Sequence, residues 1–153
     1  MRFLLIVFLF LTLPTGVFSQ KSINEELNIL IDSWHLAATK ADFNTYFSKV
    51  SADFVFLGTA PGERWEKAEF ESFCKPYFDK GKAWDFVPSN RNWKFADKGK
   101  FAFFDEDLAT WMEGCRGSGI CTKVNGEWKI IYYNLTVLIE NEKIKSFISL
   151  RKE

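Results

Sequence analysis

Three turn dipeptides divide the second half of the chain into four runs in which apolar and polar residues alternate. The dipeptides are Lys98-Gly99, Glu113-Gly114 and Asn125-Gly126, and the runs span residues 84–96, 101–112, 115–124 and 127–139. Side chains along a strand alternate between two faces, and Asn-Gly between such runs is a strong hairpin signal. The pattern predicts a four-stranded antiparallel meander, which constrains the fold more than any other feature of the sequence.

The first half of the chain is patterned mainly as helices. An apolar stripe at helical spacing predicts a helix over residues 22–40, with Ser22 and Glu25 as a capping box at its start. The other expected elements are a short helix from Asp42, a strand over residues 53–57, a helix over residues 66–79 and a final edge strand over residues 144–150. This order predicts an α+β domain whose helices cover one face of the sheet.

Composition limits the functions that such a domain could have. The 153 residues include 20 Lys and Arg, 20 Asp and Glu, and one histidine, His35. Neutral charge argues against a nucleic-acid surface, and one imidazole excludes zinc sites built from two or three. Neither metal-ligand spacing nor a phosphate-binding loop is recognisable. We therefore expect no metal, no cofactor and no nucleic-acid partner.

The first nineteen residues have the pattern of a secretory signal peptide. Arg2 precedes an apolar run from Phe3 to Leu11, and Val17 and Ser19 are small enough to precede a cleavage site. The run is shorter than the roughly 20 residues that a spanning helix needs. The sequence predicts a signal peptide over residues 1–19 and one exported domain over residues 20–153, periplasmic or extracellular. A retained N-terminal anchor is the alternative.

Export would permit disulfides among Cys74, Cys115 and Cys121. The last two lie on one predicted strand, where six residues at roughly 3.3 Å each hold them too far apart to be bridged. We therefore expect buried free thiols.

Two-residue turns fix the register of the predicted strands and therefore the face of each side chain. The register places Arg91 opposite Glu106 on the face covered by the helices, and Glu106 opposite Cys121. Gly119 and Gly117 then stand opposite Tyr132 and Asn134 on the same face, where the missing side chains leave space. On the other face, Trp111, Tyr133 and Leu135 form an apolar patch that predicts a homodimer.

An inward Arg91–Glu106 pair is weak evidence for stability, because burying two charges costs desolvation energy. A functional role or a wet cavity is the favoured interpretation, and a register slip that turns both residues to solvent is the alternative. Glu106 is the best general acid or base candidate: an apolar pocket raises its pKa, whereas Arg91 keeps it ionised. If the pair anchors a ligand, Glu106→Ala weakens binding without unfolding; if it is structural, the fold collapses. His35 lies at the edge of the apolar stripe, which predicts a surface or rim histidine, with a catalytic base as the alternative.

Residues 24–139 resemble the nuclear transport factor 2-like superfamily, and within it the SnoaL-like domains of the polyketide-cyclase type. The resemblance is carried by Asp32-Ser-Trp-His35 with Ala41-Asp42-Phe43, Glu63-Arg-Trp65, Trp111-Met112, Cys115-Arg-Gly-Ser-Gly119 and Asn125-Gly-Glu-Trp-Lys-Ile-Ile-Tyr-Tyr-Asn-Leu-Thr136. It implies a cone-shaped, curved antiparallel sheet with three helices on its concave face, often dimerising through the outer face.

The resemblance also implies a pocket between the sheet and the helices. Its lining would be Trp34, Tyr46, Trp65, Arg91, Glu106, Thr110, Tyr132 and Asn134. Catalytic members often carry a His or Asp on the last strand or after the first, where this chain has Tyr132, Asn134 and Leu57-Gly-Thr59. This departure argues against cyclase or isomerase chemistry of the known kind.

The sequence favours a secreted domain that binds a small, partly hydrophobic molecule without a cofactor. Two alternatives stay open. One is a cofactor-free cyclase, isomerase or dehydratase in which Glu106 shuttles a proton, and the other is a non-catalytic dimeric interaction module.

Overall fold

The computed structural model describes the backbone of residues 16–152 and the side chains of residues 23–152. The predicted signal peptide, residues 1–19, lies largely outside the described residues, so it stays a prediction.

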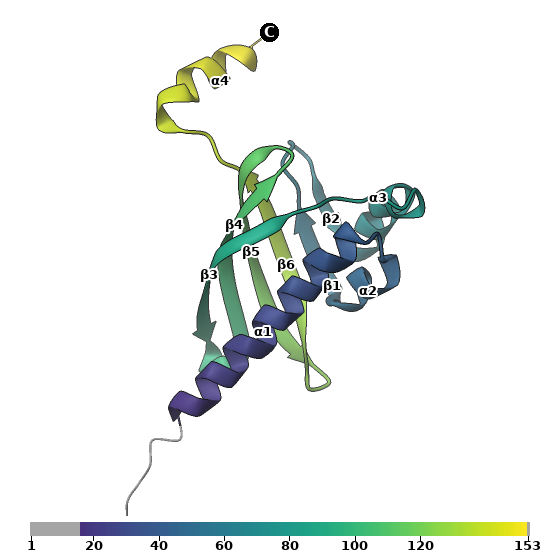
Figure 1. Cartoon of the computed structure of the whole chain (residues 1–153), viewed down its shortest axis with the longest axis vertical. Helices are drawn as coiled ribbons and strands as arrows, with labels where there is room; N and C mark the ends of the chain where they lie inside the picture. Colours follow the sequence, from purple (N-terminus) through teal and green to yellow (C-terminus); the bar gives the residue numbers. More distant parts are fainter. Residues whose placement is uncertain (1–15, 153) are drawn as a thin grey trace, which may run out of the picture.

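A curved, open sheet of six strands forms the body of the molecule, in the order β2-β1-β6-β5-β4-β3 (Figure 1). The strands are β1 (Val50–Leu57), β2 (Arg64–Glu66), β3 (Val87–Ala96), β4 (Phe101–Thr110), β5 (Glu113–Val124) and β6 (Glu127–Val137). The helices are α1 (Gly16–Thr39), α2 (Phe43–Ser48), α3 (Lys67–Asp79) and α4 (Ile144–Leu150), with short 3-10 turns at η1 (Asp97–Gly99) and η2 (Asn141–Lys143). The predicted α+β class and meander are confirmed. One strand pair, β1 with β6, is parallel, which the meander alone does not predict.

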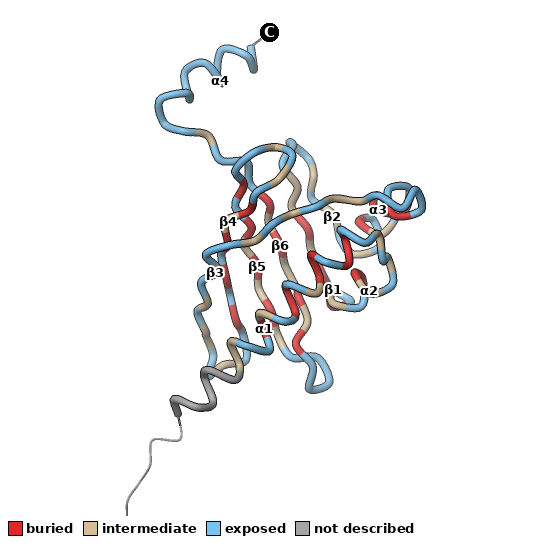
Figure 2. Tube along the Cα trace, viewed as in Figure 1, coloured by how far each residue is buried: buried red, intermediate tan, exposed pale blue. Residues whose placement is uncertain are grey.

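Helix α1 lies across one face of the sheet, and α2 and α3 gather beside β1 and β2 (Figure 1). The predicted apolar stripe of α1 is buried against the sheet, with Leu27, Ile31 and Trp34 almost inaccessible. Along β4 the buried residues alternate with exposed ones, as the period of two requires (Figure 2). The helix begins at Gly16, so Ser22 lies inside it and the predicted capping box is wrong.

The turn between β4 and β5 lies two residues earlier than predicted. Thr110 pairs with Glu113, so the turn is Trp111-Met112. The Thr110 hydroxyl accepts a hydrogen bond from the Met112 amide at 2.9 Å and donates one to the Glu113 carbonyl at 3.1 Å, which satisfies the turn backbone. Glu106 therefore stands opposite Gly117 rather than Cys121, but the even shift leaves the side chains within β4 and β5 on their predicted faces. Trp111 is the exception: it lies in the turn, so its predicted place in an outer-face patch is wrong.

A bulge in β6 overturns the faces predicted for its second half. The pairing of β5 with β6 starts as predicted at the Asn125-Gly126 turn, then slips by one residue beyond Ile130. One extra residue in a strand turns every later side chain to the opposite face. Tyr133 is consequently 0% exposed and Leu135 is buried, so neither belongs to an outer patch. Tyr132 and Asn134 take the outer face instead.

The C-terminal segment is helix α4 rather than the predicted edge strand, so the described chain has four α-helices rather than three. The spacing of Ile144, Phe147 and Ile148 is helical, and all three are exposed because α4 projects away from the sheet (Figure 1). The sequence prediction also missed β2, which pairs with the end of β1 and is too short to show alternation.

Candidate functional site

A buried carboxylate, Glu106 on β4, lies at the centre of a polar cluster between α1 and the sheet. Its Oε1 is 2.8 Å from Nε2 of His35 and accepts a hydrogen bond from the Tyr133 hydroxyl at 3.1 Å. Its Oε2 accepts from Nε of Arg91 at 2.9 Å and lies 2.8 Å from Nη2 of the same guanidinium. Because a carboxylate can only accept, Nε2 is the protonated nitrogen of His35. Glu106 thus has four donors around its two oxygens.

Arg91 links this buried carboxylate to the surface of α1. Its Nη2 lies 2.8 Å from Oδ1 of Asp32, and its Nη1 lies 3.2 Å from Oδ1 of Asn28. The same Asn28 oxygen accepts a hydrogen bond from Nε1 of Trp93 at 2.8 Å. The predicted inward pairing of Arg91 with Glu106 is confirmed, and it extends into a network that joins α1 to β3.

The surroundings keep Glu106 ionised and Tyr133 neutral. Burial by itself would raise the pKa of Glu106, but the hydrogen bonds and the electrostatic attraction that His35 and Arg91 supply outweigh it and hold that pKa below its ordinary value. Burial and the adjacent carboxylate raise the pKa of Tyr133 well above 10.0, so its hydroxyl remains a neutral donor. Of the two opposing effects left open by the sequence, stabilisation of the ionised carboxylate prevails.

His35 is not the surface or rim residue that the sequence predicts. Only 4% of it is exposed, and its ring lies 6.2 Å from the ring of Phe86. It follows Leu27 and Ile31 at intervals of four residues, which places it on the flank of the stripe that the curved sheet covers. One sequence signal could have predicted that His35 is buried: a buried Glu106 requires hydrogen-bond donors, and His35 can supply one.

The two strand glycines leave space, but side chains fill it. A Cβ at Gly117 would collide with the Tyr133 hydroxyl and lie 3.0 Å from Oε1 of Glu106. A Cβ at Gly119 would lie 2.6 Å from the Phe104 ring. These glycines therefore admit core side chains rather than a ligand.

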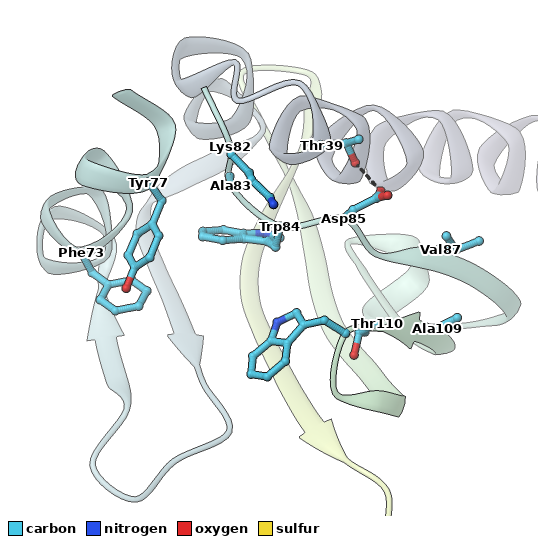
Figure 3. A pocket seen from close by; sticks show the side chains of 11 residues that line it. Thr39, Phe73, Tyr77, Lys82, Ala83, Trp84, Asp85, Val87, Ala109 and Thr110 are labelled. Carbon is cyan, nitrogen blue, oxygen red and sulfur yellow. Dashed lines mark hydrogen bonds between the residues drawn. The ribbon is translucent and has the colours of Figure 1, made fainter. Parts of the chain in front are cut away.

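An aromatic pocket opens between α3, the segment before β3 and the β4–β5 turn. Its outer compartment has a volume of about 890 Å³ and is bordered by Phe73, Tyr77, Trp84 and Thr110, with Lys82 beside Trp84 and the Thr39–Asp85 hydrogen bond (2.9 Å) at its edge (Figure 3). Its inner compartment, of about 160 Å³, is lined by aromatic side chains: Phe56, Trp65, Phe70, Phe73, Trp84, Phe86 and Trp111. Phe73, Trp84 and Trp111 line both compartments, so we treat them as one pocket.

The residues predicted to line a pocket separate into four groups. Trp65 lines the inner compartment and Thr110 the outer one, whereas Arg91 and Glu106 belong to the buried cluster. Trp34 and Tyr46 are buried in the core, stacked on each other with ring centroids 4.9 Å apart. Tyr132 and Asn134 lie on the outer face beyond the bulge, so their predicted place in the pocket is wrong. The sequence reasoning missed Trp84 as a pocket residue, having placed it in a strand that begins only at Val87.

The cysteines offer no nucleophile to this pocket. Cys74, Cys115 and Cys121 are buried free thiols, as predicted. Burial raises the pKa of Cys121 to about 12, which keeps it protonated and unreactive.

Among the described side chains, residues 23–152, no three His, Cys, Asp or Glu are grouped as a metal site would require. In the same part of the chain, no helix combines the length and apolar character needed to span a membrane.

Solved structures with the same fold include proteins of several descriptions. An NTF2-like protein of unknown function from Pseudomonas putida KT2440 is 14% identical, with TM-score 0.66 over 80% of this chain and 92% of that chain. A protein from Novosphingobium aromaticivorans, provisionally described as a scytalone dehydratase, is 10% identical, with TM-score 0.66 over 80% of this chain and 88% of that chain. Another protein from that species, provisionally described as an aromatic ring hydroxylase, is 14% identical, with TM-score 0.65 over 78% of this chain and 92% of that chain. These identities show a shared fold alone.

No curated protein matches the chain significantly. The family comparison is more specific, because the sequence model of the SnoaL-like domain matches residues 27–140, which is most of the chain. Together with the curved sheet and the neighbours of the NTF2-like fold, this match places the chain in the SnoaL-like domain family.

Proposed function

We propose that this domain binds a small, partly hydrophobic molecule in the aromatic pocket. The observation that carries the proposal is Trp111, which is 81% exposed although it is apolar and borders both compartments with Trp84. Large apolar side chains gathered in a concave, open depression are typical of ligand sites. We also propose that the domain is exported, as the signal-peptide pattern of residues 1–19 predicts.

Nile red, a neutral dye that fluoresces in apolar surroundings, tests this function. We expect saturable binding to the purified full chain, and Trp111→Ala to weaken it by about tenfold, as loss of a central aromatic contact does. Because Trp111 is exposed, the variant should fold normally, which circular dichroism checks. Phe101→Ala, which removes a half-exposed ring outside the pocket, is the matched control. Equal dye affinity in all three proteins would contradict the proposal.

Geometry favours a structural role for Glu106 over proton transfer. Its oxygens are engaged by His35, Tyr133 and Arg91, and the residue is 1% exposed. An acid or base must come within hydrogen-bond reach of the group that it protonates or deprotonates. Phe86, which lines the inner compartment, packs against His35 between the pocket and this cluster. For this reason we prefer ligand binding to the alternative of an acid–base enzyme.

We also propose a homodimer through the outer sheet face, with residues revised from the sequence prediction. Phe103, Ile120 and Tyr132 are register neighbours on β4, β5 and β6 and form a partly exposed apolar row. Such a row on a sheet face is suited to pairing with its own copy. Light scattering should give twice the subunit mass, and Ile120→Lys should halve it. Ile29→Lys, on the exposed side of α1, should leave the dimer intact. A wild-type chain with the monomer mass would contradict the dimer.

A further inference from the structure

We infer that the inner compartment binds a small organic cation, such as an alkylated ammonium group, with the Glu63 carboxylate as its counter-charge. This inference rests on the proposed function, because it names the ligand class for the same pocket. Three features support it: the aromatic walls, the fixed position of Glu63, and the distribution of charge around the pocket.

The walls of the compartment are aromatic, and aromatic rings attract cations. Trp65, Trp84 and Trp111 line the compartment, and tryptophan is the aromatic side chain that binds cations best. The rings are held in place by their neighbours: Trp65 stacks on Phe73 with centroids 4.6 Å apart, and Phe56 stacks on Phe70 at 4.2 Å. Aromatic side chains grouped around a ligand are how proteins recognise quaternary ammonium groups.

Glu63 is held at the wall by the turn that follows β1. Its Oε2 accepts a hydrogen bond from the Ala60 amide at 2.9 Å, and its carbonyl accepts one from the Gly58 amide at 2.8 Å. A Cβ at Gly58 would collide with that Oε2 and lie 2.9 Å from the Glu63 Cβ, so the turn requires glycine for the carboxylate to occupy this position. The carboxylate is therefore oriented before any ligand arrives.

Among the described residues that line the inner compartment, Glu63 is the one charged side chain, and its charge is negative. Within the described chain Glu63 makes no ion pair, and the residues that line the inner compartment include neither Lys nor Arg. Lys82 lines only the outer compartment. A neutral ligand would cover the carboxylate without compensating its charge, which is costly, whereas a cation compensates it. The volume of about 160 Å³ equals that of roughly five water molecules, enough for a trimethylammonium group.

Calorimetry with choline and with 3,3-dimethylbutan-1-ol, its neutral carbon analogue, tests the inference on the full chain. We expect choline to bind at least about tenfold more tightly, and Glu63→Gln to reduce this preference severalfold, leaving the part that the aromatic rings supply. Glutamine retains an oxygen that can accept from the Ala60 amide, so the variant removes the charge and keeps the turn. Glu127→Gln, an exposed carboxylate at the β5–β6 hairpin, is the control and should leave the preference unchanged.

The outcomes separate this inference from the proposed function. Equal binding of the two probes, or a preference that Glu63→Gln leaves undiminished, would overturn the cation site while leaving a ligand pocket in place. The same holds if neither probe binds but Nile red does. Failure of both probes and of Nile red would overturn the inference together with the proposed function.

Discussion

Replacement of Glu106 by alanine is expected to lower the free energy of unfolding by about 3–5 kcal/mol, because removing one partner of a buried pair leaves Arg91 with only the exposed carboxylate of Asp32 as counter-charge. The substitution deprives Arg91, His35 and Tyr133 of their common acceptor in the interior. Urea denaturation followed by circular dichroism measures the loss. Asp107→Ala removes the adjacent carboxylate, which is half exposed and pairs loosely with Arg116 at 3.9 Å, so it should cost less than about 1 kcal/mol.

The same carboxylate should make the fold sensitive to acid. The folded-state pKa of Glu106 is below its ordinary value of 4.5, so the unfolded chain takes up a proton first as the pH falls. Its contribution to stability is therefore complete above pH 4.5 and is lost as the pH drops through the folded-state pKa. Glu106→Gln cannot titrate, so the gap in stability between wild type and variant should narrow towards low pH. A Glu106→Ala protein as stable as wild type, or a constant gap across this range, would contradict a structural role for the cluster.

Substitution of Gly117 by alanine is expected to destabilise the fold by about 2–3 kcal/mol through overpacking. The new methyl group would collide with the Tyr133 hydroxyl, which its hydrogen bond to Glu106 holds in place. Gly114→Ala is the matched control on the same strand, because no atom lies within 4 Å of the added Cβ, and it should change stability by less than about 0.5 kcal/mol.

A double-mutant cycle identifies the cause of that loss. Tyr133→Phe removes the hydroxyl and its hydrogen bond, which costs about 1 kcal/mol by itself. Combined with Gly117→Ala it should cost less than the sum of the two single changes, because the main steric conflict is gone. Strict additivity would mean that the alanine is unfavourable for a reason other than contact with Tyr133.

The sequence predicts the elements of this fold better than the details of its site. The apolar stripe of α1 and the alternation of β4 are local patterns, so they are visible without the structure. The pairing of Arg91 with Glu106 was also predictable, because it follows from the alternation of side chains across a short turn. An error of two residues at the β4–β5 turn preserved that alternation, whereas the single-residue bulge at Ile131 did not.

The parts that were missed depend on tertiary contacts. The bulge lets Tyr133 reach Glu106 through the gap at Gly117, and no local pattern encodes this fit. Trp84 and Trp111 lie in loops. The alternation of apolar and polar residues does not predict where a loop side chain points, so only the structure, with α3 in place, shows that both line one pocket. His35 similarly required knowledge of how far the curved sheet wraps around α1.

The parallel pairing of β1 with β6 has a consequence for the order in which the molecule forms. Contacts that join distant parts of a chain are entropically costly and slow folding. The pairing of β1 is incomplete until β6, the last strand in the chain, has formed. Until then the β1 side of the β1–β2 hairpin is an unpaired strand edge, which can pair with other chains. The same late strand delivers Tyr133 to Glu106. Completion of the buried cluster and pairing of this edge therefore both depend on β6, and we expect a chain that lacks β6 to be prone to aggregation.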